Sequence, residues 1–373
     1  MTTANDNWYQ ISDVSELDSP VLIVFPERVK ANIQTAISMV GNVGQLRPHV
    51  KTNKSAEATQ LMLDAGITKF KCATIAEAEM LGMINAPDVV LAYQPLGPKL
   101  YRFIELIKKF PSTKYSCLTD NISAAKEQAD AFAVNKLKVH VYVDLNVGMN
   151  RTGIIPDEAA IELCAFASSA KGMKFAGLHA YDGHVRNKDF ALRTKECDEA
   201  FALIEKLKQE LLKIGVSTAN IIAGGSPTFP IHAGRKNIEC SPGTFIYWDK
   251  GYTDLCPEQN FLTAAVLVTR IISLPSPTRL CTDLGHKSVA AENEIGRRVF
   301  FLNVSDLTPV GQSEEHLVCE AGNSHPHKTG DVLYGLPYHV CPTVALYERV
   351  YTIENGKVTG EWKNIARDRK VTI

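Results

Sequence analysis

The sequence predicts a (β/α)₈ barrel followed by an all-β domain. Two observations predict the barrel: short apolar runs rich in strand-forming residues recur through residues 20–254, and stretches of helical length separate them. A third observation concerns residues 255–373, where strand-like segments follow one another with little helix between them. These residues are predicted to form the all-β domain, and residues 1–19 are expected to join it.

Eight strand-like runs account for the predicted barrel. The first is followed by PERVKANIQTAISMV, which opens with Pro26, and the first turn of a helix tolerates proline. An open, doubly wound sheet is the alternative, but no GxGxxG motif follows the first run. The runs are VLIVF (21–25), QLRPHV (45–50), KFKCAT (69–74), DVVLAY (88–93), KYSCLT (114–119), KVHVYVDL (138–145), KFAGLHAY (174–181) and NIIAGGS (220–226).

Composition narrows the classes of partner. The formal net charge of −1 argues against nucleic acid or an anionic membrane surface, and no apolar run approaches the roughly 20 residues that span a bilayer. The N-terminal stretch shows no basic start followed by an apolar segment. Nine cysteines occur without a CxxC pair, which is typical of reduced thiols. We therefore expect a cytoplasmic protein with a small-molecule partner.

The stretch RPHVKTNKS places Lys51 just past a predicted barrel strand. The carboxyl ends of barrel strands carry the chemistry in this fold. A lysine at such a position can form an imine with an aldehyde cofactor if burial lowers its pKa. A surface lysine is the alternative interpretation of this position.

Two turns resemble phosphate-binding turns. AGGSPT (223–228) ends a predicted strand with two glycines followed by hydroxyl residues, and ECSPGTFIYWD (239–249) offers the backbone N–H groups of Gly243 and Thr244. A Gly-Gly pair alone is as often a simple turn. Two such turns late in a barrel match the usual phosphate site of this fold. A lysine and a phosphate site in one barrel suggest pyridoxal 5′-phosphate (PLP) as the cofactor.

The strand-like PYHVCPT contains His339 and Cys341 at positions that share one face of a strand. An imidazole and a thiolate at this spacing could bind one zinc ion, although a chance pairing of a histidine with a buried cysteine fits the spacing equally. His325 and His327 have the same spacing in a segment whose composition indicates a loop, and they receive no role.

Together these residues resemble the D-serine dehydratase and D-threonine aldolase family, whose barrel is of the alanine racemase type. RPHVKTNKS is similar to the cofactor-lysine motif of that family, with Asn53 in place of a frequent histidine. Further motifs follow in the expected order over nearly the whole chain: TIAEAEML (74–81), AYQPLGPKL (92–100), VDLNVGMNRTG (143–153), AYDGH (180–184), TDLGHKS (282–288), SEEH (313–316) and GLPYHVCPTVALYERVY (335–351).

The resemblance implies roles for matching residues. Lys51 would bind PLP covalently and remove the Cα proton of the substrate. Arg151 would lie near the phenolic oxygen of the cofactor or the substrate carboxylate, and Tyr181 against the pyridine ring. The phosphate would be contacted by Gly225, Ser226, Gly243 and Thr244. Where the family usually has a sequence close to GGGTGT, this chain has GGSPTF, and Pro227 offers no backbone donor.

His339 and Cys341 fall on the metal site that the resemblance implies. In the family, dehydratases present His-x-Cys to zinc and an aldolase pattern presents His-x-Asp to manganese. Because a thiolate selects zinc, Cys341 favours dehydration, with Zn²⁺ as the expected ion and Mn²⁺ as the alternative.

We therefore expect a PLP- and zinc-dependent lyase of D-3-hydroxy amino acids, with D-serine dehydratase first and D-threonine aldolase second. A racemase would need a second acid/base group that the sequence does not identify, and a non-catalytic PLP carrier would leave the His-x-Cys pair unused. The resemblance also implies a head-to-tail homodimer with shared active sites.

Overall fold

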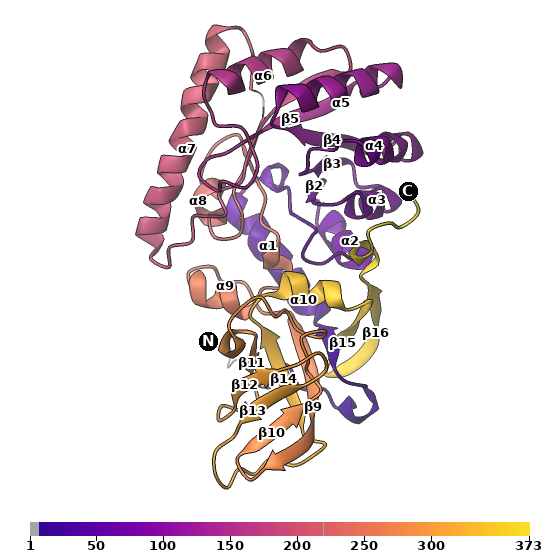
Figure 1. Cartoon of the computed structure of the whole chain (residues 1–373), viewed down its shortest axis with the longest axis vertical. Coiled ribbons are helices and arrows are strands. Elements are labelled where there is room, and N and C mark those ends of the chain that lie inside the picture. Colours follow the sequence, from indigo (N-terminus) through magenta and orange to yellow (C-terminus); the bar gives the residue numbers. More distant parts are fainter. Residues whose placement is uncertain (1–6, 219) are drawn as a thin grey trace. The chain divides into compact units, whose positions relative to one another are not determined.

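The computed structural model describes residues 7–218 and 220–373, which form two compact units. We call the first the β unit; it contains residues 7–33, 52–58 and 244–367. We call the second the barrel unit; it contains residues 34–51, 59–243 and 368–373. Each unit is therefore built from separate stretches of the chain, and each is described by itself below (Figure 1).

A parallel sheet forms the centre of the barrel unit. Its seven strands are hydrogen-bonded in chain order, from β2 to β8. Residues 46–50 close the ring. On one side, the backbone N–H groups of Arg47 and His49 donate to Cys240 at the end of β8 and to Pro242 beyond it; on the other, Val50 N–H donates to Lys71 on β2, and Lys71 N–H donates to Pro48. The strands are β2 (Lys69–Cys72), β3 (Asp88–Leu91), β4 (Lys114–Thr119), β5 (Val139–Leu145), β6 (Met173–Ala180), β7 (Asn220–Ala223) and β8 (Ile238–Cys240).

Helices alternate with these strands and cover the sheet from outside (Figure 1). Several begin with a side-chain cap: Asn121 accepts hydrogen bonds from the first turn of α5, and Asp189 accepts one from Leu192 in α7. The helices are α2 (Ala56–Asp64), α3 (Ile75–Met83), α4 (Pro98–Lys109), α5 (Ile122–Val134), α6 (Glu158–Ser169), α7 (Phe190–Lys213) and α8 (Phe229–Ala233), and α1 (Pro26–Val40) precedes them.

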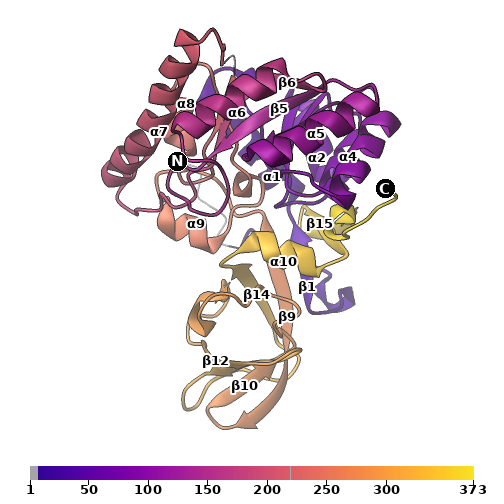
Figure 2. The same ribbon diagram turned by 45° about the horizontal axis from the view of Figure 1, so that its top comes forward.

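The β unit contains a nine-stranded, mostly antiparallel sheet. Its longest strand, β9, pairs with β1, β14 and β10 along successive parts of its length, and β9, β14 and β10 can be followed in Figure 2. The strands are β1 (Val21–Val24), β9 (Ala265–Ser276), β10 (Arg279–Thr282), β11 (Val299–Phe301), β12 (Thr308–Gln312), β13 (Leu317–Glu320), β14 (Val332–Pro337), β15 (Arg349–Glu354) and β16 (Lys357–Lys363), with helices α9 (Lys250–Leu255) and α10 (Val340–Leu346).

Two strand assignments made from the sequence differ from the structure. Residues 21–25 were expected to open the barrel, but β1 pairs with β9 and β15 in the β unit. All four β1 residues are buried, and a short apolar run of this kind fits either type of sheet. The eighth barrel position is instead completed by β8, which has only three residues and was not predicted. The expected strand at 45–50 is present only as isolated bridges, preceded by a 3₁₀ turn at Val43–Gln45.

The boundaries of the units differ accordingly from the expected 20–254 and 255–373. Residues 20–33, 52–58 and 244–254 belong to the β unit, and 368–373 belong to the barrel unit. Of the N-terminal segment, Tyr9, Ile11 and Leu17 pack in the core of the β unit, and residues 1–6 lie outside the described residues.

Two further expectations from the sequence concern reduced cysteines and the absence of a membrane-spanning segment. All nine cysteines lie among the described residues, and each has a free thiol. In the described ranges, no helix is both long and apolar enough to cross a membrane.

Candidate cofactor and metal site

Three cationic side chains lie around one aromatic ring in the barrel unit. The ring belongs to Tyr181, the residue that follows β6. Its centroid is 5.9 Å from Lys51 Nζ, 5.7 Å from Lys71 Nζ and 5.1 Å from the guanidinium carbon of Arg151. The structure thus brings together Lys51, Arg151 and Tyr181, which the sequence predicted, and adds Lys71, which it did not.

Small residues leave room for the Tyr181 ring. A methyl group added at Gly183 would lie 2.3 Å from a ring carbon of Tyr181, and one added at Gly225 would lie 3.0 Å from another. Real Cβ atoms essentially never approach to the first of these distances, so a side chain at Gly183 would displace the ring. The AYDGH and AGGSPT motifs are therefore adjacent in space and together hold this tyrosine.

The turn after β7 is ordered by its own hydrogen bonds. The amide of Gly225 donates to Thr228 Oγ1 at 3.2 Å, and that hydroxyl donates to Asp182 at 2.8 Å. Gly224 has a φ of +79°, and a side chain there would collide with the ring of His232, 2.5 Å from the added carbon. Ser226 is buried in this turn, and its amide precedes Pro227. The turn is therefore rigid, with the Gly225 amide already used inside it.

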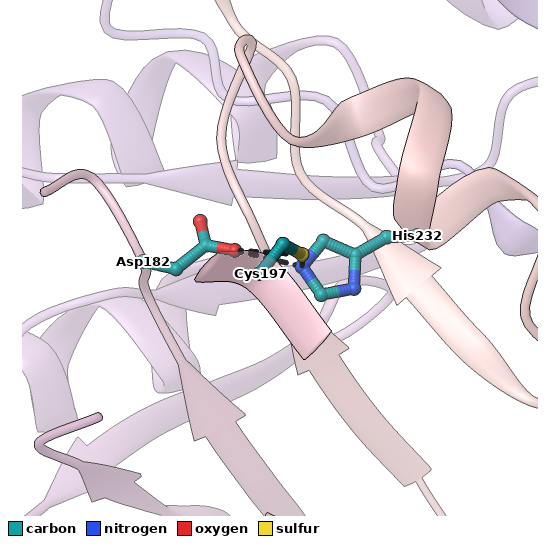
Figure 3. Close-up of side chains that lie close together, drawn as sticks. All are labelled: Asp182, Cys197 and His232. Carbon is teal, nitrogen blue, oxygen red and sulfur yellow. Dashed lines mark hydrogen bonds and ion pairs between the residues drawn. The ribbon is translucent and has the colours of Figure 1, made fainter. Parts of the chain in front are cut away.

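Behind the turn, Asp182, Cys197 and His232 are buried close enough together to suggest a metal site (Figure 3). The charges around them argue otherwise. Arg235 lies 2.5 Å from His232 Nδ1 and donates to it, so Nε2 carries the proton donated to Asp182 at 2.8 Å. Burial raises the pKa of the Cys197 thiol to about 12, which keeps it protonated. A guanidinium and a neutral thiol do not suit a cation, and we interpret the cluster as support for the turn.

Polar side chains from three barrel strands meet beside Tyr181. Lys71 Nζ on β2 lies 3.1 Å from His179 Nε2 on β6, and His179 Nδ1 lies 2.6 Å from Asp144 Oδ1 on β5. All three are buried. The sequence held a usable signal, because each is a polar residue inside an apolar strand, and Asp144 and His179 lie opposite each other in register. Sequence reasoning missed them because no motif groups them.

Arg47, which lies near Lys51 in the RPHVKTNKS stretch, has a structural role. Its guanidinium is buried and pairs with Glu239 at 2.6 Å and Asp88 at 2.7 Å. These acids stand on β8 and at the start of β3, and the amino-terminal ends of barrel strands serve stability. Although burial raises the pKa of Asp88, the neighbouring Arg47 holds it below its ordinary value.

In the β unit, His339 and Cys341 lie at the start of a helix and not on a strand as expected. His339 is the residue before α10, and Pro342 falls in its first turn, where a missing N–H costs little. Asp249 Oδ2 accepts the backbone N–H of Val340 at 2.9 Å and so fixes this end of the helix. The two candidate ligands still meet, because the side chains of His339 and Cys341 are hydrogen-bonded.

The hydrogen bonds of His339 and Cys341 suit a metal site. His339 Nδ1 lies 2.5 Å from Glu292 Oε1, which leaves Nε2 as the nitrogen for an ion; a carboxylate behind a metal-binding histidine is a common arrangement. Burial lowers the pKa of His339, but the hydrogen bond and charge of Cys341, together with the bond to Glu292, raise it to about 9. Cys341 Sγ is 3.0 Å from Thr52 Oγ1 and 3.7 Å from Thr244 Oγ1.

Among the described residues, the only group of three candidate ligand atoms within 4.8 Å of one another is Asp182, Cys197 and His232. His339 and Cys341 therefore have no third protein ligand at that distance in this part of the chain. His327 pairs with Asp306 at 3.1 Å and stacks on His325. His339 and Cys341 thus stay a predicted pair of ligands, and a metal bound by only two protein ligands would leave positions for water or substrate.

The barrel unit fits PLP on its own chemistry. Lys51 Nζ has no hydrogen bond or ion pair with any described residue, so its amine is available to an aldehyde. Two more cations lie around Tyr181 and would balance an anionic cofactor. Ser241 Oγ, just past β8, is buried and finds no hydrogen-bond partner among the described residues, and it precedes Gly243 by two positions. A phosphate supplies the acceptor that such a hydroxyl lacks.

Comparison with known proteins agrees with this geometry. Residues 25–250 match the alanine racemase N-terminal domain, and residues 264–353 match a putative serine dehydratase domain. A D-threonine aldolase from Arthrobacter sp is 25% identical over 95% of this chain and 94% of its own length. A 3-hydroxy-D-aspartate aldolase from Paracoccus denitrificans (strain Pd 1222) is 24% identical, covering 96% and 94%.

A D-threo-3-hydroxyaspartate dehydratase from Delftia sp. (strain HT23) is 22% identical over 94% of this chain and 97% of its own. Among solved structures, the D-threonine aldolase from Filomicrobium marinum superposes with a TM-score of 0.85 at 24% identity, covering 94% of this chain and 95% of that one. Because the alanine racemase domain matches more than half of the chain and the second domain follows it, this protein is an enzyme that belongs to the alanine racemase N-terminal domain family, in its D-threonine aldolase and D-serine dehydratase branch.

Proposed function

We propose that this enzyme is a PLP- and zinc-dependent dehydratase of D-3-hydroxy amino acids, with D-serine as substrate and pyruvate and ammonia as products. The observation that carries the proposal is the pair His339 and Cys341, hydrogen-bonded to each other and supported by Glu292. Imidazole and thiolate form a donor set that selects zinc over manganese or magnesium.

Solved structures of a D-threo-3-hydroxyaspartate dehydratase support this assignment. They include a variant with alanine in place of a histidine, and a second variant with alanine in place of a cysteine two residues further on, the latter in a metal-free form. The spacing is that of His339 and Cys341 in this chain. A histidine and a cysteine at this spacing in a dehydratase support elimination as the proposed reaction here.

Each site residue has a definite task in the proposed reaction. When bound by Lys51, PLP would supply an electron sink for Cα of the amino acid, and a zinc ion held by His339 and Cys341 would supply a Lewis acid for the β-hydroxyl. Lys51 Nζ binds the cofactor and takes the Cα proton. Arg151 neutralises the substrate carboxylate or the phenolic oxygen of the cofactor, and Tyr181 holds the cofactor ring.

The phosphate is assigned to the two turns. Ser226 and Gly225 come from the first turn, and Gly243 and Thr244 from the second, with the buried hydroxyl of Ser241 as a further donor. The Gly225 amide already donates to Thr228, so Gly225 is not expected to donate to the phosphate. Because glycine has no side chain, it would instead let the phosphate approach the turn closely.

The test compares two cysteine variants. Cys341→Ala should lose bound zinc and D-serine turnover while keeping PLP absorbance, because the thiolate ligand is gone but the barrel unit is intact. Cys197→Ala is the matched control, since that buried thiol belongs to the cluster behind the turn; it should keep its zinc. Zinc by mass spectrometry and pyruvate by a coupled assay are the readouts. Unchanged zinc and turnover in Cys341→Ala would remove the metal assignment.

A retro-aldol cleavage is the second candidate, because the two relatives at 25% and 24% identity are aldolases. The same residues would serve it: the β-hydroxyl would lose its proton and the Cα–Cβ bond would break, giving glycine and an aldehyde. The two reactions differ in which bond at Cβ breaks, so product identity separates them.

The enzyme is also proposed to be a homodimer in which each active site takes residues from both chains, as the resemblance implies. Sedimentation at micromolar protein should show a dimer. A monomer with full activity would contradict this.

A further inference from the structure

Two buried threonine hydroxyls lie beside the sulfur of Cys341, and one of them has no part in the proposed reaction. Thr52 Oγ1 is 3.0 Å from Cys341 Sγ, and Thr244 Oγ1 is 3.7 Å from it. All three residues belong to the β unit, in stretches far apart in the sequence. Thr244 is assigned to the phosphate, whereas Thr52, the threonine of RPHVKTNKS, has received no role. The Thr52 hydroxyl is therefore a buried polar group at the predicted metal site that the proposed function does not use.

The Thr52 hydroxyl depends on the Cys341 sulfur for its hydrogen bonding. Thr52 is fully buried, and within the described ranges Cys341 Sγ is the only hydrogen-bond partner of its side chain. A buried hydroxyl without a partner is costly, because water cannot replace the lost bond. A sulfur that binds a metal ion is a thiolate, which carries no hydrogen and can only accept. Thr52 is then the donor, so the direction of this hydrogen bond is fixed when a metal is bound.

Each of the two predicted ligands has a supporting group behind it. Glu292 Oε1 lies 2.5 Å from His339 Nδ1, and the Thr52 hydroxyl supports Cys341 in the same way. Partners of this kind orient a ligand, and their loss typically lowers metal affinity by roughly 10- to 100-fold. A hydrogen bond to the thiolate also draws electron density from the sulfur, which then gives less charge to the ion. With only two protein ligands predicted, the orientation of each one weighs heavily on metal binding.

We propose that Thr52 is a positioning residue for the metal site: its hydroxyl donates a hydrogen bond to the Cys341 thiolate, fixes the orientation of that ligand and reduces the charge that the sulfur gives to the ion. The ion thereby stays a stronger Lewis acid. The inference deepens the proposed function and rests on it only in taking His339 and Cys341 as metal ligands. It holds for elimination and for retro-aldol cleavage alike, because it concerns the ligand and not the bond that breaks.

The experiment makes two measurements on the full-length protein and its variants. Zinc affinity is measured by competition with a chromophoric chelator, and the sulfur-to-metal charge-transfer band is measured by absorbance after loading with Co²⁺. Both use protein without PLP, because Thr52 directly follows Lys51 and a change in cofactor binding would otherwise enter the result.

Three threonine variants isolate the hydroxyl. Thr52→Val removes it but keeps the shape of the side chain, so zinc should bind about tenfold more weakly. The cobalt band should move to longer wavelength, because the sulfur holds its electrons less tightly without the hydrogen bond. Thr52→Ser keeps the hydroxyl and should restore both properties. Thr352→Val is the matched control, at a buried threonine of the same unit whose hydroxyl bonds to Thr359 at 3.1 Å, and it should behave as the wild type does.

Each outcome bears on one claim. Wild-type zinc affinity in Thr52→Val, or a band at the wild-type position, would overturn the inference while the ligand assignment stands. Weaker binding with an unmoved band counts against it because packing, and not the hydrogen bond, would then be the cause. A band that is absent from the wild type, or kept in Cys341→Ala, would instead overturn the metal assignment of the proposed function. If Thr52→Val does not fold, Thr52→Ala removes the same hydroxyl without added bulk, and the same two measurements decide.

Discussion

Replacing the buried Lys71 by methionine should make the apoenzyme more stable at neutral pH. Burial, together with the charges of Lys51 and Arg47, lowers the Lys71 pKa from its ordinary 10.5 to about 7. A difference of this size between the folded and unfolded chain corresponds to about 4 kcal/mol of lost folding stability at pH 7. Methionine also gives up the hydrogen bond to His179, worth about 1 kcal/mol, so the net gain is about 3 kcal/mol as an upper bound.

The sign of the pH dependence follows from which state binds the proton. Below pH 7 both folded and unfolded chains carry the proton on Lys71, and the folded state bears the full cost of the buried charge. Above pH 7 the folded chain releases this proton while the unfolded chain keeps it, so the wild type recovers stability with rising pH. The advantage of Lys71→Met should therefore shrink by about 1.4 kcal/mol per pH unit towards pH 10.

Urea unfolding at pH 7 and pH 9, followed by far-ultraviolet circular dichroism, measures this difference. Dichroism suits the barrel unit, because the three tryptophans, Trp8, Trp248 and Trp362, all lie in the β unit and report on it. An advantage of the variant that is the same at both pH values would refute the reasoning, since it would arise from packing and not from the buried amine.

Two further predictions concern the barrel unit. Arg47→Met should destabilise it by about 3 kcal/mol in urea unfolding, because Glu239 and Asp88 lose their buried partner; Lys114→Met, at a half-exposed pair with Asp88, should cost less than about 1 kcal/mol, and equal effects would contradict this assignment. Gly183→Ala should weaken PLP binding about tenfold, measured by absorbance titration, because the added carbon displaces the Tyr181 ring. Gly234→Ala, where the nearest atom is 3.6 Å away, should bind PLP as the wild type does, and an equal loss in both variants would refute the steric cause.

The sequence was most informative where a pattern repeats. Apolar runs alternating with helices located β2 to β7, because each strand is buried on both faces of a parallel sheet. The same reasoning misplaced β1, since four buried residues do not reveal which strands they will pair with. It also missed β8, whose three residues are too short to show a period.

In the candidate site, too, some residues could be predicted from sequence motifs and others could not. Lys51, Arg151 and Tyr181 follow strand ends in recognisable motifs, and the structure brings them together. The spacing of His339 and Cys341 predicted a strand, but the two residues meet at the start of α10. The backbone there is fixed by Asp249, which lies 91 positions from Val340 in the sequence and was not visible to a local pattern. The hydrogen-bonded line from Lys71 through His179 to Asp144 also depends on β2, which is far in sequence from β5 and β6; each residue is a polar position in an apolar strand, but no motif links the three.

Incubation of the purified enzyme with D-threonine, PLP and zinc tests the central claim most directly, because this substrate can follow either reaction. Elimination gives 2-oxobutyrate and ammonia, which is the result predicted from the His339 and Cys341 pair. Glycine and acetaldehyde as the products would contradict the claim and would assign the enzyme to the aldolases.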